Sequence, residues 1–109
     1  MKRLSASLLK FILFLFGYRL VKFRWCYVYL IREKRSKKPL YVGKTCRCVD
    51  KRFKEHLSKR YTNPAVYNAS KRNKLEIIVL KKTTEEKVYQ EEQKYIDRYR
   101  DKYKMYNRT

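Results

Sequence analysis

Five side chains in this 109-residue chain are of types that can act together on a phosphate group. Tyr29 and Tyr41 stand in two short apolar runs, YVYLI and LYVGKT. Arg52 and His56 follow four residues apart, a spacing that puts both on one face of a helix. Glu92 lies further along, in a helical pattern. A guanidinium can bind a phosphate through two hydrogen bonds and a phenol can pass on a proton, so the set suits phosphate chemistry if the fold gathers it.

The position of Glu92 is unusual for a charged residue. It shares one helical stripe with four apolar or aromatic residues, Val88, Tyr95, Ile96 and Tyr99. Burying an unpaired carboxylate is costly, so three interpretations stay open. Glu92 faces a polar cleft, or it meets a cation, or it points outward because the helix has another phase.

Charge narrows the class of partner. Thirty Lys and Arg against ten Asp and Glu give a formal net charge of +20. Nucleic acid is the leading partner, because each phosphate that is neutralised also releases condensed counterions. Ribosomal RNA and anionic lipid are alternatives that charge alone does not exclude. The length allows one domain and leaves no room for a separate recognition module.

The three cysteines predict a reduced setting. Cys26, Cys46 and Cys48 are an odd number and lack the paired spacing of a disulfide framework. We therefore expect an intracellular protein, in the cytoplasm, the nucleoid or a phage-infected cell. A zinc site is not favoured, because no second ligand pair follows the CRC sequence.

Residues 1–24 form a basic, apolar N-terminal segment that contains no acidic residue. Its apolar residues recur at helical spacing, which predicts an amphipathic helix. The apolar run is too short to span a bilayer, and no good cleavage site for a signal peptide follows it. The helix could cover an apolar face of the domain or lie on a membrane surface as a peripheral contact. We place the start of the core at Trp25, so the core covers 25–109.

The core alternates between strand and helix patterns. Strands are predicted at 25–31, 40–44 and 74–82, and the first two should pair as an antiparallel hairpin. Both faces of the first strand carry apolar or aromatic residues, so both should be covered. Helices are predicted from Val49 and, after a capping Thr83 or Thr84, towards the C-terminus. The intervening segment, with Pro64, is expected to be a loop or a short helix.

With these motifs in order, the chain from about residue 26 to 107 resembles the GIY-YIG endonucleases. YVY at 27–29 stands at the family's first tripeptide, with a tyrosine in place of glycine, and YVG at 41–43 stands at the second. Arg52 and His56 follow on the next helix. EEQKYIDRY looks like the helix that bears the family's metal-binding glutamate, and MYN resembles its terminal Tyr-Asn.

The resemblance implies a fold and an activity. The fold is α/β (α+β), a small three-stranded antiparallel sheet flanked by helices, in a nuclease domain at 25–109. The implied function is a metal-dependent DNA endonuclease that hydrolyses phosphodiester bonds by nicking or cutting, with Glu92 binding Mg²⁺ or Mn²⁺. Glu92 is favoured over its neighbour Glu91 by the family's Glu-Gln order.

The resemblance also implies catalytic roles for Tyr29, Tyr41, Arg52, His56 and Glu92. One of the two tyrosines takes a proton from the attacking water, and the sequence leaves open which one. A free phenol has a pKa of about 10, so nearby positive charge must favour its ionised form. Arg52 is the expected phosphate ligand, whereas His56 is expected to bond a tyrosine or the phosphate.

Lys44 is a further source of that positive charge. It belongs to a set of basic residues expected to bind DNA phosphates, which comprises Lys44, Arg47, Lys51, Lys71 and Arg72. Gly43 should let the following helix or the substrate backbone come close to the strand end. Asn107 is expected to fix the C-terminal segment by hydrogen bonds.

Other functions stay open at this point. The chain could be a nucleic-acid-binding module that kept the fold and lost turnover. It could also be a nuclease that acts on single-stranded DNA and is held at a membrane by residues 1–24. Sequence specificity should be low, or come from loops, from the basic 59–74 segment or from a partner protein. A phage or mobile-element origin and a monomeric or dimeric state are equally open.

Overall fold

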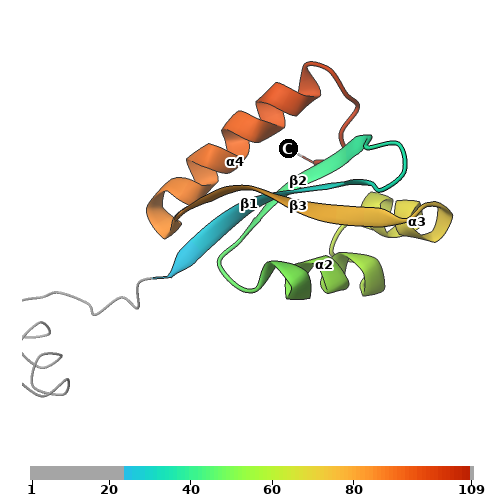
Figure 1. Ribbon diagram of the computed structural model, residues 1–109, viewed down its shortest axis with the longest axis horizontal. Coiled ribbons are helices and arrows are strands. Elements are labelled where there is room, and N and C mark those ends of the chain that lie inside the picture. Colours follow the sequence, from blue (N-terminus) through green and yellow to red (C-terminus); the bar gives the residue numbers. More distant parts are fainter. Residues whose placement is uncertain (1–23, 109) are drawn as a thin grey trace, which may run out of the picture.

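The computed structural model describes residues 24–108. Three strands form one antiparallel sheet in the order β2-β1-β3. They are β1 (Trp25–Glu33), β2 (Pro39–Thr45) and β3 (Leu75–Thr84). Figure 1 shows β1 in the middle, flanked by the two other strands. The predicted three-stranded antiparallel sheet and its first hairpin are therefore confirmed.

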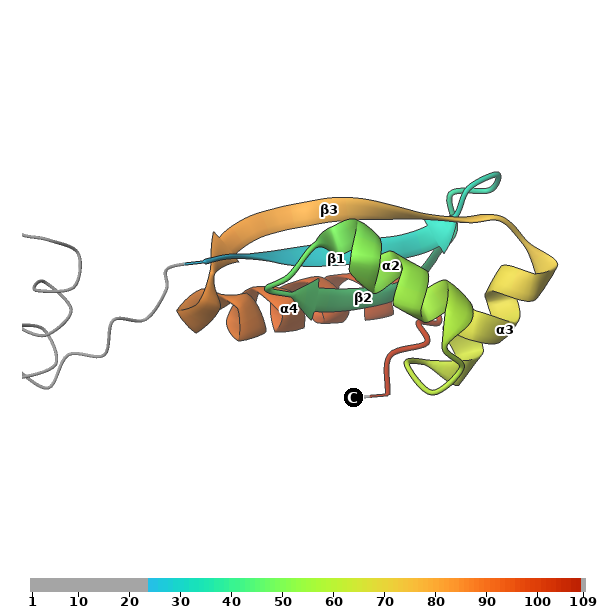
Figure 2. The ribbon, with the colours of Figure 1, turned by 90° about the horizontal axis from the view of Figure 1, so that it is seen from below.

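Helices cover both faces of this sheet. α4 (Glu85–Arg100) lies along one face, and α2 (Val49–Ser58) and α3 (Pro64–Arg72) lie on the other (Figures 1 and 2). Among residues 24–108 no helix has the length and apolar character needed to cross a bilayer. The predicted amphipathic helix over 1–24, with its membrane contact, lies outside the described residues apart from Arg24.

Alternating side chains of β1 supply the two halves of the core. On the α4 face Cys26, Val28 and Leu30 pack with residues of β2 and α4. On the opposite face Tyr29 and Ile31 pack with Val66 of α3. All of these β1 side chains are buried. The expectation that both faces of the first strand are covered is confirmed, since neither set reaches solvent.

The helix starts agree in part with their predicted caps. α3 begins at Pro64, and the side chain of Asn63 accepts a hydrogen bond from the backbone N–H of Val66. Thr84 is the N-cap residue of α4, but its side chain makes no capping hydrogen bond. The predicted N-cap position is therefore confirmed, but the threonine side chain does not make the hydrogen bond of a cap. Instead, Glu85 in the first turn is bound by Arg24 at 2.9 Å.

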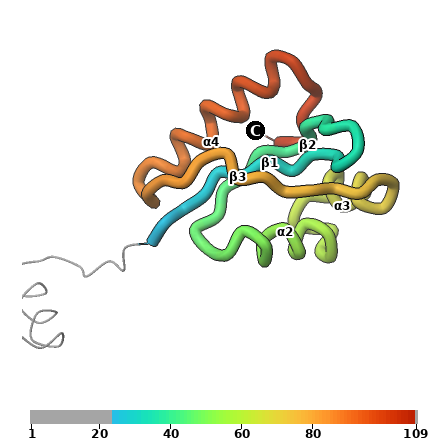
Figure 3. Tube along the Cα trace, viewed as in Figure 1, coloured from blue at the N-terminus to red at the C-terminus, as the bar shows by residue number. Residues whose placement is uncertain are grey.

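The C-terminal segment returns to the sheet and pairs with the outer edge of β2 (Figure 3). The backbone N–H of Tyr106 donates to the carbonyl of Leu40 at 2.7 Å. The Asn107 amide then accepts from the N–H of Val42 at 3.0 Å and donates to its carbonyl at 2.7 Å. Asn107 therefore acts as a structural hydrogen-bonding residue, as expected, and satisfies part of an otherwise open sheet edge.

The cysteines correct the expectation drawn from their number. Cys26 and Cys46 form a disulfide between β1 and the end of β2, whereas Cys48 is free and exposed. The hairpin register pairs Tyr27 with Thr45, so the two cysteines stand opposite each other just beyond that pair. The odd number of cysteines led to the wrong expectation, because neither their number nor their spacing contains information on strand register. The bond also removes the basis for inferring a reducing compartment.

Alkylation tests this bond directly. Unfolded without reductant, the chain should take up one alkyl group, on Cys48, and after reduction all three cysteines should react. The Cys26→Ala/Cys46→Ala variant should be less stable by about 3 kcal/mol, because the loop closed by the bond is about twenty residues long. Mass spectrometry and urea unfolding measure both effects. Uptake of three groups before reduction would contradict the pairing.

Candidate active site

Two tyrosines meet beside a glycine on neighbouring strands. Tyr29 of β1 pairs with Gly43 of β2, and Tyr41 lies two residues before Gly43 on the same face. A Cβ atom on Gly43 would overlap the Cζ and Oη of Tyr29 and stand 2.7 Å from Cε1 of Tyr41. The two ring centroids are 6.3 Å apart. The space left by the missing side chain is taken by phenol rings, and not by the helix or substrate backbone that the sequence led us to expect.

His56 supports the tyrosines from α2. Its Nε2 lies 2.9 Å from the Oη of Tyr29, and its ring centroid is 5.0 Å from that of Tyr41. The imidazole is fully buried. Burial, and then the charge of Arg52, lower the pKa of His56 to about 4. His56 is therefore neutral at pH 7, with Nδ1 unpartnered within residues 24–108.

Burial also sets the protonation state of both phenols. It is the main cause that raises the pKa of Tyr29 and of Tyr41 above the ordinary value. The carboxylate of Glu92 raises the pKa of Tyr41 further, whereas the guanidinium of Arg52 opposes the rise at both tyrosines. Positive charge was expected to favour a phenolate, but in the protein alone burial outweighs it. Both hydroxyls are protonated at neutral pH.

Arg52 lies next to this pair, on the first half of α2. Its side chain is 29% exposed, and its Nη1 donates to Glu55 at 3.4 Å. The same carboxylate accepts from Arg47 at 3.3 Å. Glu55 therefore holds two guanidinium groups on one side of the site, a role that the sequence did not indicate.

Glu92 approaches from α4, on the other side of β2. Its carboxylate is half-buried and has no hydrogen-bond or ion-pair partner within residues 24–108. Burial raises its pKa, and the nearby ammonium of Lys44 opposes that rise. Glu91, by contrast, pairs with Lys94 at 3.4 Å. Of the three interpretations of Glu92, the one in which it points away from the domain is wrong, because it lines a hollow together with Tyr41.

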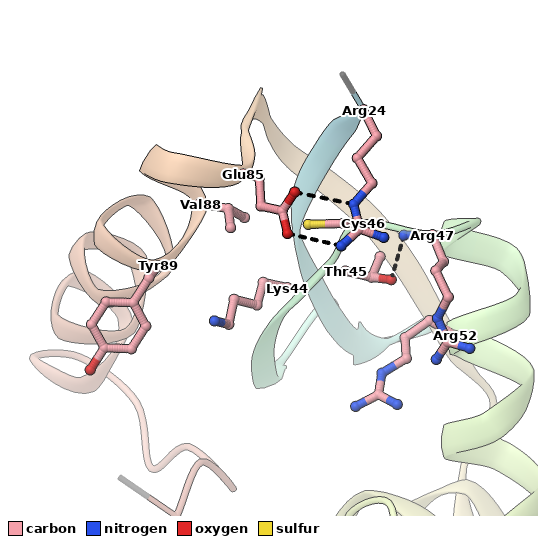
Figure 4. Close-up of a pocket in the computed structure, with 9 residues that line it drawn as sticks. All are labelled: Arg24, Lys44, Thr45, Cys46, Arg47, Arg52, Glu85, Val88 and Tyr89. Atoms are coloured by element: carbon pink, nitrogen blue, oxygen red, sulfur yellow. Dashed lines mark hydrogen bonds and ion pairs between the residues drawn. The ribbon is translucent and has the colours of Figure 1, made fainter. Parts of the chain in front are cut away.

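Two hollows flank these residues. The larger, called the basic groove here, has a volume of about 430 Å³ and is drawn in Figure 4. It is lined by Arg24, Lys44, Thr45, Cys46, Arg47, Arg52, Glu85, Val88 and Tyr89. The smaller, the amide hollow, measures about 180 Å³ and is lined by Tyr41, Thr62, Asn63, Glu92, Ile96, Asn107 and Arg108. Arg52 lines the first hollow and Glu92 the second, and the charges of both act on the pKa of Tyr41, so the candidate site lies around Tyr41.

The predicted phosphate-binding residues separate into two groups. Lys44 and Arg47 line the basic groove, and Lys51 is exposed at the start of α2. Lys71 and Arg72 are exposed at the end of α3, where Arg72 lines a different hollow beside residues 33–36. The structure brings Lys44 and Arg47 to the candidate site and leaves Lys71 and Arg72 outside it.

Tyr89 and Arg24 line the groove, but the sequence analysis did not identify either as a site residue. Tyr89 lies three residues before Glu92, so helical spacing alone places both on one side of α4 and could have indicated it. Arg24 reaches the groove through its ion pair with Glu85, which is 61 residues away in the chain. Such a long-range pair has no local sequence signal.

The residues also allow a test of whether a metal ion fits. Within residues 24–108 no group of three or more His, Cys, Asp and Glu side chains could hold one. A zinc site of several protein ligands therefore does not fit there. A half-buried carboxylate with no partner does fit a hard divalent ion, because Mg²⁺ is commonly bound by one or two carboxylates.

Comparison with known families decides the relationship. The model of the GIY-YIG catalytic domain matches residues 25–107. The chain belongs to the GIY-YIG family. Comparisons with curated proteins and with solved structures found no match. Membership of the GIY-YIG family indicates nuclease activity on DNA, and the matched range includes all five side chains that opened the sequence analysis.

Replacing Gly43 by alanine should disable the site. The added methyl group would displace Tyr29 and Tyr41, and overpacking of this kind costs about 1–3 kcal/mol. We expect lower stability in urea unfolding and loss of DNA cleavage. Lys81→Ala, at an exposed position of β3, is the control and should change neither. A Gly43→Ala protein with normal stability and cleavage would contradict the packing described.

The buried histidine predicts a pH dependence of stability. The pKa of His56 is about 4 in the folded state and about 6.5 in the unfolded chain, so the unfolded state binds its proton first. The stability that neutral, buried His56 provides is fully present above pH 6.5 and is lost as the pH falls towards 4. The total loss should be about 3 kcal/mol.

Urea unfolding at several pH values measures this effect. His56 is the only histidine, and Glu76 and Glu85, whose pKa values are lowered by their ion pairs, act only at lower pH. Glu92, with a raised pKa, acts in the opposite direction. Between pH 6.5 and 5, the free energy of unfolding should therefore fall less steeply for His56→Gln than for the wild type. Equal slopes for both proteins would contradict a neutral, buried His56.

Proposed function

We propose that this chain is a metal-dependent endonuclease that hydrolyses phosphodiester bonds in DNA, with Tyr41, Arg52 and Glu92 at its reacting centre. The observation that carries the proposal is their convergence. Tyr41 of β2 and the unpaired carboxylate of Glu92 on α4 line the amide hollow together, and the guanidinium of Arg52 on α2 is close enough to act on the pKa of Tyr41. These are the groups that proton transfer and phosphate binding require.

Arg52 binds the phosphate in this proposal. Its ion pair with Glu55 engages one guanidinium nitrogen, Nη1, so other N–H groups are available to phosphate oxygens. Its position is fixed before substrate arrives, because Glu55 holds it. A preorganised donor stabilises negative charge in the transition state without reorganising during the reaction.

Tyr41 is the phenol that meets water. It is partly exposed and lines the amide hollow, whereas Tyr29 has no exposed surface. A neutral phenol accepts one hydrogen bond and donates another, so Tyr41 can take a proton from water while its own proton passes to a non-bridging phosphate oxygen of the substrate. Tyr29, bonded to His56, positions Tyr41 by filling the space above Gly43.

Glu92 is the residue that would bind Mg²⁺ or Mn²⁺. When bound, such an ion polarises water and offsets negative charge on the phosphate and on the leaving oxygen. The raised pKa of Glu92 means that its carboxylate lacks a sufficient counter-charge in the protein alone. Lys44 supplies part of that charge from the basic groove.

Low intrinsic sequence specificity, with help from loops or a partner protein, is part of this proposal. So are an intracellular location and a membrane contact through residues 1–24. The formal net charge of +20 supports the low specificity, because phosphate contacts carry no sequence information, and the basic, apolar pattern of residues 1–24 supports the membrane contact. The intracellular location follows only from DNA as the proposed substrate.

Nicking of supercoiled plasmid tests the function. Glu92→Gln should lower the rate by roughly a hundredfold or more, because the metal ligand is lost while the shape is kept. Binding to the same DNA should be almost unchanged. The matched control is Glu91→Gln on the same helix, whose carboxylate pairs with Lys94, and it should nick at the normal rate.

Two results would contradict the proposal. A wild-type protein that binds plasmid in Mg²⁺ or Mn²⁺ and never nicks it would be a binding module without turnover. Equal rates for Glu92→Gln and the wild type would remove Glu92 from the site.

A further inference from the structure

Tyr89 is an exposed aromatic residue in a basic groove, and the reaction proposed above does not use it. Its side chain is 59% exposed. It stands on α4 one turn before Glu92, and the Nζ of Lys44 lies 5.0 Å from its ring centroid. Resting on the proposed function, we propose that the basic groove binds a single strand of DNA next to the scissile phosphate, with Tyr89 stacked on an unpaired base.

The groove has one aromatic wall and one basic wall. In Figure 4 Tyr89 projects from α4 on one side, Arg47 and Arg52 stand on the other, and Lys44 lies between them. Lys44 is near enough to Glu92 to influence its pKa and also contacts the Tyr89 ring. A nucleotide in the groove is therefore adjacent to the reacting centre.

The charges suit a phosphate backbone. Arg24 is matched by Glu85, and Arg47 and Arg52 share one carboxylate, that of Glu55. Lys44 has no carboxylate in an ion pair with it within residues 24–108. The groove thus keeps a surplus of positive charge. A phosphate would attract the Lys44 ammonium away from the Tyr89 ring, since a charged pair is stronger than a cation on an exposed ring, and free that ring face for a base.

The size and shape of the groove favour an unpaired base. Its volume of about 430 Å³ is in the range of pockets for single small molecules, so it can hold one nucleotide, whereas a base-paired duplex could only lie across its mouth. Inside a duplex the faces of each base are covered by its neighbours, so a tyrosine can stack only on a base that has left the stack. Stacking of this kind tolerates any base, because every base has a π-face.

Binding measured without divalent metal tests the stacking alone. Fluorescence anisotropy would compare a labelled single strand, a blunt duplex and a duplex with a single-stranded flap, all in EDTA. Tyr89→Ala should weaken binding of the single strand and the flap by roughly tenfold and leave the blunt duplex unchanged. Tyr89→Phe should bind as the wild type does, because the ring is kept.

Tyr103→Ala is the matched control. Tyr103 is also an exposed tyrosine, but it lies beyond the far end of α4 and packs near Tyr99. It should bind all three DNAs normally. Two results would overturn the stacking. Tyr89→Ala could weaken binding of the blunt duplex as much as that of the single strand, or it could leave the affinity for the single strand unchanged. Because the assay involves no cleavage, its result is independent of plasmid nicking, and failure of the proposed nuclease function would appear only in that other experiment.

Discussion

The candidate site depends on one steric relation, the absence of a side chain at Gly43 opposite Tyr29. Without that gap the phenol of Tyr29 has no place between the strand and its neighbour Tyr41. Once the ring is seated there, its hydroxyl reaches His56 of α2, and this contact ties the helix that carries Arg52 to the sheet. The geometry of the reacting centre thus follows from the register of a single hairpin.

The disulfide between Cys26 and Cys46 secures that register at the end of β2, and the Asn107 amide makes two hydrogen bonds to the backbone of Val42 in the middle of the strand. A shift of one residue would turn every side chain of β2 to the other face and separate the two phenols. Both restraints border the site, since Cys46 lines the basic groove and Asn107 lines the amide hollow.

The two sides of the site differ in charge: burial keeps one side neutral, whereas charged side chains lie on the other. Burial keeps His56 neutral and both phenols protonated, so in the proposed reaction the tyrosine cluster starts without charge. Arg52 supplies positive charge, and Glu92 supplies an unpaired negative charge that favours a cation. The exposed surface of Tyr41 is where water can enter. This arrangement is consistent with nuclease activity of the GIY-YIG family, to which the matched range 25–107 assigns the chain.

Much of the fold could be predicted from local patterns, and the parts that could not depend on tertiary distances. The dense apolar run in β3 and the alternation in β1 indicated strands because both reflect the period of a pleated sheet. The disulfide and the use of the Gly43 gap could not be predicted, since both depend on strand register. The ion pairs of Glu55 and Arg24 could not be predicted for a similar reason, because salt-bridge partners show no periodic pattern in the sequence. The Glu92 carboxylate was found because it interrupted an apolar stripe.

The most direct test of the site is the single-turnover nicking rate of Tyr41→Phe. This change removes one oxygen atom and keeps the ring that packs beside Gly43, so the fold and the affinity for DNA should be unchanged. If Tyr41 handles the proton of the attacking water, the rate should fall by roughly a hundredfold or more. A Tyr41→Phe protein that nicks plasmid as fast as the wild type would contradict the account.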